Sequence, residues 1–169
     1  RLDLVNTGGT LTFSDAARAT NLVAFAGVVA AFGNGLTCVQ TLDNQAGAAL
    51  TFGGTVEAAS LLNATRDLTF GGAVTCGVFR NSNADLTFAD AVTCGEFRSD
   101  GTDTLTFAPG AAVAVSSLWL NGTPDASLLL RSATPGSRWL LTVVRVSGAM
   151  YVDVRDSDGF LVGSGIVDG

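Results

Sequence analysis

Two stretches of the chain, LTFGGAVTCGVFR at 68–80 and LTFADAVTCGEFR at 86–98, are near copies of each other, 18 residues apart. Their opening tripeptide, Leu-Thr-Phe, also begins at positions 11, 50 and 105. A degenerate copy, Ala30-Ala31-Phe32, divides the one long interval, so that successive copies are 18 to 20 residues apart. A fixed period of this length is typical of repeat architectures, in which each repeat is one structural unit stacked on the next.

Apolar residues alternate with Thr inside each repeat, as in Leu-Thr-Phe and Val-Thr-Cys. Alternation with a period of two predicts short strands with one buried face. Gly, Asn, Asp and Ala separate the strands, and a third strand is expected around the twelfth position of the repeat. The sequence therefore predicts an all-β fold, a parallel β-solenoid whose coils of 18 to 20 residues stack about 4.8 Å apart.

Alignment of the six repeats gives columns of residues that should form ladders inside the solenoid. The third position is aromatic in every coil: Phe13, Phe32, Phe52, Phe70, Phe88 and Phe107. The seventh position is aliphatic throughout: Ala17, Leu36, Val56, Val74, Val92 and Ala111. The twelfth is Leu or Phe in four coils, while the second and sixth coils depart from it. We expect the Phe column to be the main structural ladder.

The winding of the solenoid has two candidates. A left-handed hexapeptide helix also has 18 residues per coil, but Arg80 would occupy its third aliphatic position. Intervals of 19 and 20 residues also break the strict six-residue step. A right-handed β-helix is favoured, since right-handed crossover is the default for parallel strands.

The carboxy-terminal third differs from the rest in composition and spacing. It contains both Trp residues, the only Met and the only Tyr of the chain. We therefore divide one domain into regular coils at 1–116 and a divergent terminal section or cap at 117–169. Trp119 and Trp139 are expected in a terminal core, with a sugar-binding groove as the alternative.

Composition excludes several classes of function. The chain has no His and no Lys, so it cannot supply a His-based triad, a His-ligated metal site or a P-loop. A net charge of −6 argues against a nucleic-acid partner, and no apolar run approaches the length of a membrane span. We expect no catalytic activity, no cofactor and no bound metal. A polysaccharide enzyme based on carboxylates is the remaining enzymatic alternative.

The ninth position of the repeat contains all three cysteines. Cys76 and Cys94 occupy it in adjacent coils, about 4.8 Å apart, which is within range of a disulfide. Cys38 lies two coils before Cys76, with Ala58 between them, and is too far away to bridge. Small apolar residues fill this column, so buried free thiols are favoured over a Cys76–Cys94 bridge.

Threonine forms an outward column next to the buried Leu and Phe. The column consists of Thr12, Thr51, Thr69, Thr87 and Thr106, interrupted at the second coil. Thr is a favoured strand residue whose hydroxyls pair between neighbouring strands. Ice-binding solenoids usually present two Thr columns on one plane, and here each strand gives one. Ice binding is therefore a lower alternative.

Charged columns are few. Asp67 and Asp85 should stack, as should Arg80 and Arg98, and we expect Asp–Arg pairing across a corner because stacked like charges repel. The segment 153–159 has some acidic positions of a calcium loop, but Val154 stands where the first ligand belongs. A polar turn is therefore favoured there.

Runs such as LTFGGAVT at 68–75, repeated with Gly and Asn corners, resemble the β-helical repeats of very large secreted bacterial surface proteins. Filamentous-haemagglutinin-like and autotransporter-passenger adhesins are the examples. The segment 128–139, followed by 151–158, is similar to a motif that closes such repeat blocks. The resemblance implies an extracellular or cell-surface location and a structural or adhesive role.

The expected function is that of a structural protein that stacks head-to-tail into a fibre. A solenoid end exposes unpaired strand edges, which template the addition of another chain unless they are blocked. The segment 2–5 contains one charged residue and no Pro, so it does not block such an addition. We therefore expect Leu2, Leu4 and Val5 to form an assembly edge. The alternative is an adhesin or carbohydrate-binding fragment, whose partner would be a glycan or a host surface.

Overall fold

The computed structural model describes residues 3–4, 10–23, 29–44, 49–64 and 66–161, and every regular element in these ranges is a β-strand. The strands form two parallel sheets. The larger contains β1 (Asp3–Leu4), β3 (Ala17–Ala19), β4 (Asn21–Val23), β6 (Leu36–Asn44), β8 (Val56–Ala64), β10 (Val74–Ser82), β12 (Val92–Asp100), β14 (Ala112–Asn121), β16 (Trp139–Met150) and β18 (Ser157–Leu161). The smaller contains β2 (Thr10–Phe13), β5 (Val29–Phe32), β7 (Ala49–Phe52), β9 (Leu68–Phe70), β11 (Leu86–Phe88), β13 (Thr104–Phe107), β15 (Leu128–Ser132) and β17 (Val152–Val154).

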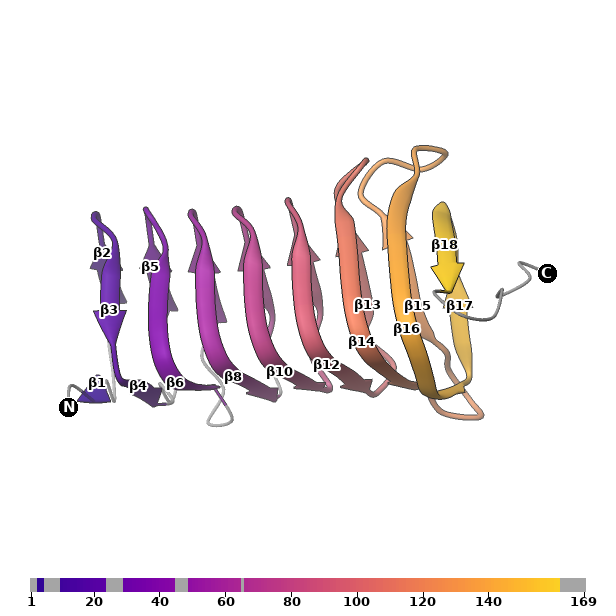
Figure 1. Cartoon of the computed structure of the whole chain (residues 1–169), viewed down its shortest axis with the longest axis horizontal. Helices are drawn as coiled ribbons and strands as arrows, with labels where there is room; N and C mark the ends of the chain where they lie inside the picture. The colour runs from indigo at the N-terminus through magenta and orange to yellow at the C-terminus, as the bar shows by residue number, and fades with distance from the viewer. Residues whose placement is uncertain (1–2, 5–9, 24–28, 45–48, 65, 162–169) are drawn as a thin grey trace.

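The chain passes from one sheet to the other in every coil, which makes the molecule a β-solenoid of about seven turns with about 19 residues each. The predicted fold is thereby confirmed. Figure 1 shows the larger sheet in front with strands running downward, and the smaller sheet behind with strands running upward, while the chain advances from left to right. That is a right-handed winding, in agreement with the expectation from crossover chirality.

In the four coils that contain β6, β8, β10 and β12, the second and third expected strands are a single strand of nine residues that bends. In β10, Val74 and Cys76 point inward, and the next inward residues are Phe79 and Asn81. The change of phase between Cys76 and Phe79 turns the chain around a corner at Gly77. A Cβ on Gly77 would lie 2.8 Å from the carbonyl oxygen of Ala59, so glycine lets the stacked corners approach closely.

Small insertions explain where the predicted columns were wrong. In the second coil a bulge between Cys38 and Thr41 shifts the register, so that Leu42, one position late, pairs with Leu61. In the sixth coil Val92 pairs with Val113 and not with Ala111. The aliphatic and Leu/Phe columns are therefore continuous through both coils.

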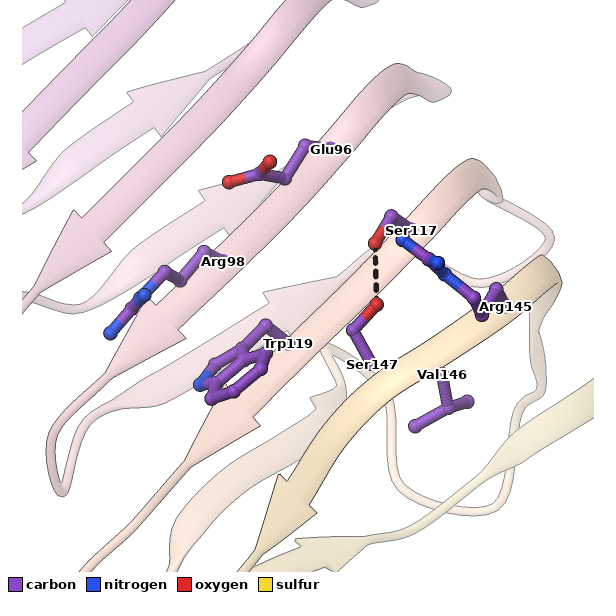
Figure 2. A pocket seen from close by; sticks show the side chains of 7 residues that line it. All are labelled: Glu96, Arg98, Ser117, Trp119, Arg145, Val146 and Ser147. Carbon is purple, nitrogen blue, oxygen red and sulfur yellow. Dashed lines mark hydrogen bonds between the residues drawn. The ribbon is translucent and has the colours of Figure 1, made fainter.

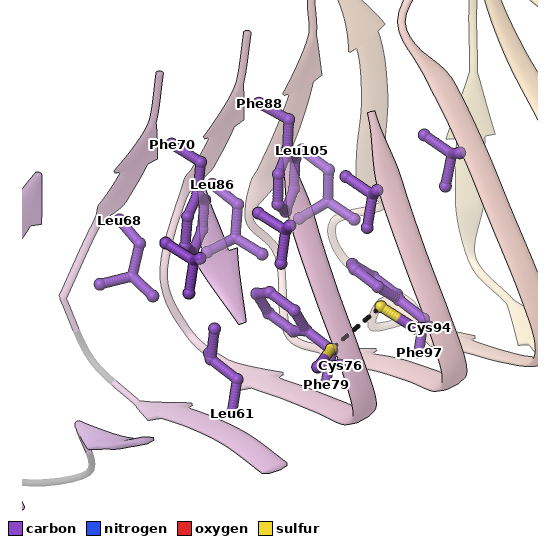
Figure 3. Packing of buried hydrophobic residues seen from close by; sticks show 14 of the residues in the cluster. Leu61, Leu68, Phe70, Cys76, Phe79, Leu86, Phe88, Cys94, Phe97 and Leu105 are labelled. Carbon is purple, nitrogen blue, oxygen red and sulfur yellow. Dashed lines mark hydrogen bonds between the residues drawn. The ribbon is translucent and has the colours of Figure 1, made fainter. Parts of the chain in front are cut away.

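The predicted Phe ladder is confirmed as the centre of the core. Rings from Phe13 to Phe107 stack face to face, with successive centroids 4.9 to 5.3 Å apart. A second stack, Phe79 on Phe97, meets this ladder edge-on, with centroids 5.8 to 6.4 Å from the rings of Phe70 and Phe88. Figure 3 shows part of this core, with Phe70 and Phe88 from the smaller sheet, Phe79 and Phe97 from the larger sheet, and the neighbouring Leu and Cys side chains. Offset and edge-on aromatic pairs add to the stabilisation that burial alone gives.

The regular spacing ends after β14. Val113 pairs with Leu141, a step of 28 residues, whereas Val74 and Val92 are 18 apart. The extra residues form the longer connections around β15 that Figure 1 shows beside β16. The division proposed at 116/117 falls inside β14, which keeps its register with β12 along its whole length. No helix in the described ranges is long and apolar enough to cross a membrane.

Candidate functional site

The cysteine column lies where the sequence places it. Cys38 pairs in register with Ala58, and Ala58 with Cys76, which pairs with Cys94. All three cysteines are buried and none forms a disulfide, as the favoured alternative predicts. The Sγ atoms of Cys76 and Cys94 are 3.1 Å apart and share a thiol hydrogen bond. That hydrogen bond and burial raise the pKa of Cys94 far above its ordinary value, so its thiol stays protonated and unreactive.

A ladder of buried asparagines was missed by the sequence analysis. The Nδ2 of Asn44 donates to the Oδ1 of Asn63 at 2.7 Å, and the Nδ2 of Asn63 donates to the Oδ1 of Asn81 at 2.8 Å. The Nδ2 of Asn81 then donates to the Oγ of Ser99 at 3.2 Å. Asn63 and Asn81 also donate to backbone carbonyls three residues further on, which ties down each corner. The four side chains are at most 3% exposed, and their hydrogen bonds link successive coils along the axis.

The expected pairing of Asp67 and Asp85 with Arg80 and Arg98 is wrong. Asp67 accepts a hydrogen bond from the backbone N–H of Asp85, and Asp85 accepts one from that of Thr104. Each carboxylate thus accepts a hydrogen bond from a backbone N–H of the next coil. Arg80 instead contacts Glu96 at 3.3 Å, and Arg98 contacts Asp100.

The acidic turn near the carboxy-terminal end is held by arginines. Asp153 Oδ2 lies 2.6 Å from Arg131 Nη2 and 3.2 Å from Arg155 Nη2. Asp158 forms an ion pair with Arg138. Arg131 and Arg155 hold the pKa of the Asp153 carboxyl below its usual range. No cluster of three or more His, Cys, Asp or Glu side chains in the described ranges is arranged to hold a metal ion.

The Thr column forms one outward rank on the smaller sheet. Thr51, Thr69 and Thr87 are exposed and in register from strand to strand. Ala31 pairs with Thr51 at one end of this rank. At the other end Thr87 pairs with Thr106, and Thr106 pairs with Arg131. The strands β9 and β11 present a single outward side chain each, so the surface is a narrow ridge.

At both ends of the stack, the outermost described strands pair on one side only. Within the described ranges, β1 pairs only with β4, and β2 pairs only with β5. Leu4 lies in β1, while Leu2 and Val5 lie outside the described residues. At the other end β17 pairs only with β15, and β18 pairs only with residues 139–143 of β16.

Exposed apolar side chains gather at the carboxy-terminal end of the stack. Among the side chains that the structure describes, seven large apolar ones are exposed, and six of them lie between residues 140 and 154: Leu140, Val144, Val146, Met150, Tyr151 and Val154. Val39, in the bulge of β6, is the seventh. Residues 144–150 of β16 also have no strand beside them on the side away from β14, as far as the structure describes the chain. An open edge and an apolar surface therefore coincide on these coils.

The two tryptophans have different environments. Trp139 is fully buried, as predicted, whereas Trp119 lies on the outer surface of the larger sheet, contrary to the prediction of a core position. The inward neighbours Leu118 and Leu120 require the residue between them to point outward. Figure 2 shows Trp119 in a shallow groove over β12, β14 and β16, and the groove encloses about 600 Å³.

Comparison with protein families, with curated proteins and with solved structures finds no match to this chain.

Proposed function

We propose that this protein is a non-catalytic structural solenoid that stacks end to end with further copies of itself into a fibre. The proposal rests on one coincidence on the last coils: a strand edge without a partner in the described part of the chain, and six exposed apolar side chains. A second copy that adds its first coils there would pair the free backbone groups and remove the apolar surface from water. The same parallel geometry would continue from subunit to subunit, as in any head-to-tail contact that does not close.

The amino-terminal end of the stack could accept a further coil without a change in its own structure. Phe13 is only partly buried, and its ring is the first of the described stack, 4.9 Å from the ring of Phe32. Leu4, in β1, belongs to the outermost strand of the larger sheet at this end. An added coil would therefore find both a strand to pair with and an apolar ring to cover.

We also propose an extracellular or cell-surface location, which follows from the resemblance to the repeats of large secreted bacterial surface proteins. What supports this part is the repeat sequence itself. A mechanical role is consistent with a molecule whose buried columns and backbone hydrogen bonds all run along one axis.

Sedimentation velocity over a wide concentration range tests the assembly. We expect the wild-type chain to form larger species as its concentration rises. Val144→Asp should reduce their formation, because it places a charge on the open edge of β16. The matched control is Val39→Asp, which alters a similarly exposed valine (50% against 55%) far from that edge.

A second pair of variants tests the opposite end of the stack. Leu4→Pro removes a backbone N–H from β1 and should reduce assembly, whereas Leu4→Ala keeps that N–H and should not. A wild-type chain that sediments as a monomer at every concentration would refute the proposal. Equal effects of Val144→Asp and Val39→Asp would refute the role of the carboxy-terminal edge.

A further inference from the structure

The groove around Trp119 is formed by a β-bulge. Leu118 pairs with Val146 and Trp119 pairs with Gly148, so Ser147 is an extra residue of β16. Its hydroxyl lies 2.7 Å from that of Ser117, and Figure 2 shows this pair in the middle of the groove. Bulges often re-aim side chains next to binding sites. This bulge places two hydroxyl groups beside an aromatic ring.

The indole of Trp119 lies between its two partners in the sheet, Gly148 of β16 and Arg98 of β12. A Cβ on Gly148 would lie 3.2 to 3.3 Å from three atoms of the indole, so the ring packs directly over the glycine backbone. The guanidinium of Arg98 lies 5.3 Å from the ring centroid. The indole N–H is buried and has no acceptor in the described part of the chain. Tryptophan N–H groups usually find a partner when they are buried, so this donor is an unsatisfied polar group in the wall of the groove.

The groove has an excess of positive charge. Glu96 is paired with Arg80, and Arg98 with Asp100. Arg145 lines the same groove, is exposed, and has no carboxylate partner in the described ranges. The uncompensated charge of Arg145 stands out in a chain whose net charge is −6. The guanidinium is suited to a carboxylate, to which it can donate two parallel hydrogen bonds.

We infer that this groove binds a polysaccharide of uronic acid residues. The sugar carboxylate pairs with Arg145, the sugar hydroxyls exchange hydrogen bonds with Ser117 and Ser147, and the apolar C–H face of the sugar ring lies against the outward edge of the Trp119 indole. The combination of one aromatic edge, one unpaired cation and a pair of hydroxyls matches the three kinds of group on such a sugar. All residues of the groove belong to one chain, so binding does not require end-to-end stacking, although Val146 is common to the groove and to the apolar surface of the last coils.

Isothermal titration calorimetry tests the inference with tetragalacturonate as the acidic ligand and its methyl ester as the uncharged control. The full chain is titrated at low ionic strength, where exposed charges are least screened. We expect tetragalacturonate to bind and the ester to bind at least about tenfold more weakly, since the ester cannot form a charge-assisted hydrogen bond. Arg145→Gln should weaken tetragalacturonate binding by about tenfold or more for the same reason.

Arg18→Gln is the matched control, because Arg18 is also an exposed strand residue without an ion pair in the described ranges. It should leave the affinity unchanged. Trp119→Leu should abolish binding while its thermal unfolding stays close to that of the wild type. The inference is overturned if the wild-type chain does not bind, if the ester binds as tightly as the acid, or if Arg18→Gln weakens binding as much as Arg145→Gln. The test of Arg145 does not depend on whether the Trp119 variant folds.

Discussion

The ring of Trp139 stacks on the ring of Phe107 with centroids 4.3 Å apart, although the two residues belong to opposite sheets. The column that carries Phe in six coils reaches Ser132 in β15, which pairs with Phe107. A serine leaves space inside the coil, and the indole from β16 fills it. The aromatic stack is thus extended by one ring at the point where the repeat pattern ends, and Trp139 is the residue that joins the regular coils to the last ones.

Replacing Trp139 should therefore cost more stability than any exposed substitution in the same region. Trp139→Ala removes a fully buried ring and is expected to lower the free energy of unfolding by about 3–5 kcal/mol. Urea unfolding followed by circular dichroism measures this change. Trp119→Ala, on the outer face, is the control and should cost clearly less; equal losses for the two variants would contradict the placement of the two rings.

The asparagine ladder should contribute to stability in proportion to the hydrogen bonds that each amide makes. Asn63 accepts from Asn44 and donates to Asn81 and to the carbonyl of Arg66. Asn63→Ala leaves these buried partners unsatisfied and should lower the free energy of unfolding by about 2 kcal/mol or more. Asn34→Ala, which removes an exposed hydrogen bond to the carbonyl of Ser14, should change it by less than about 0.5 kcal/mol. Urea titration of both variants decides whether the buried ladder matters.

The three thiols should react slowly with a thiol reagent in the native protein, and all three should react after unfolding. Cys38, Cys76 and Cys94 are 1%, 7% and 4% exposed, and the Cys94 thiol is held in its protonated form. A chromogenic disulfide reagent should therefore detect almost no thiol in the native protein and all three after denaturation without reductant. Detection of one thiol after denaturation would mean that Cys76 and Cys94 are bridged.

Two aspartates should affect stability with opposite dependence on pH. Burial, together with the nearby charges of Asp85 and Asp67, raises the pKa of Asp103 above its ordinary value of 3.8, and its buried Oδ2 has no donor in the described ranges. The folded state then binds this proton more tightly than the unfolded state. The stabilisation is complete below about pH 3.8 and is lost as the pH rises through the raised pKa. Asp103→Asn should thus be more stable than the wild type at pH 7, and the difference should disappear in acid.

Asp153 is the comparison for that experiment. Arg131 and Arg155 lower its pKa, so its contribution is present above the ordinary value and is lost as the pH falls through the lowered pKa. Asp153→Asn should lower stability at pH 7, by a modest amount because the carboxylate is partly exposed. Thermal unfolding measured between pH 3 and pH 7 checks both variants, and a change of the same sign in the two would contradict these assignments.

The period and the inward columns were predictable because parallel in-register strands place the same residue type at the same point of every coil. The Phe and Cys columns follow from this rule alone. The asparagine ladder follows the same rule, and the recurrence of Asn44, Asn63 and Asn81 at one position was its signal. The one-residue bulge in the second coil obscured that recurrence, since it moves Asn44 out of step.

The groove could be predicted only in part. Leu118 and Leu120 alternate around Trp119 and place it outside, so its exposure was available from the sequence. The bulge at Ser147 and the long step from Val113 to Leu141 were not, because they arise from connections that have no counterpart in the repeat. The partners of Asp67 and Asp85 were missed because backbone N–H groups, which no sequence pattern displays, compete with arginine for the carboxylates.

Electron microscopy of the purified chain tests end-to-end stacking most directly. A single molecule is a rod of roughly 35 Å, since about seven coils stack about 4.8 Å apart. We predict unbranched filaments many times longer than this, which lengthen with concentration and become shorter in Val144→Asp. Micrographs that show only rods of single-molecule length at every concentration would contradict the proposed function.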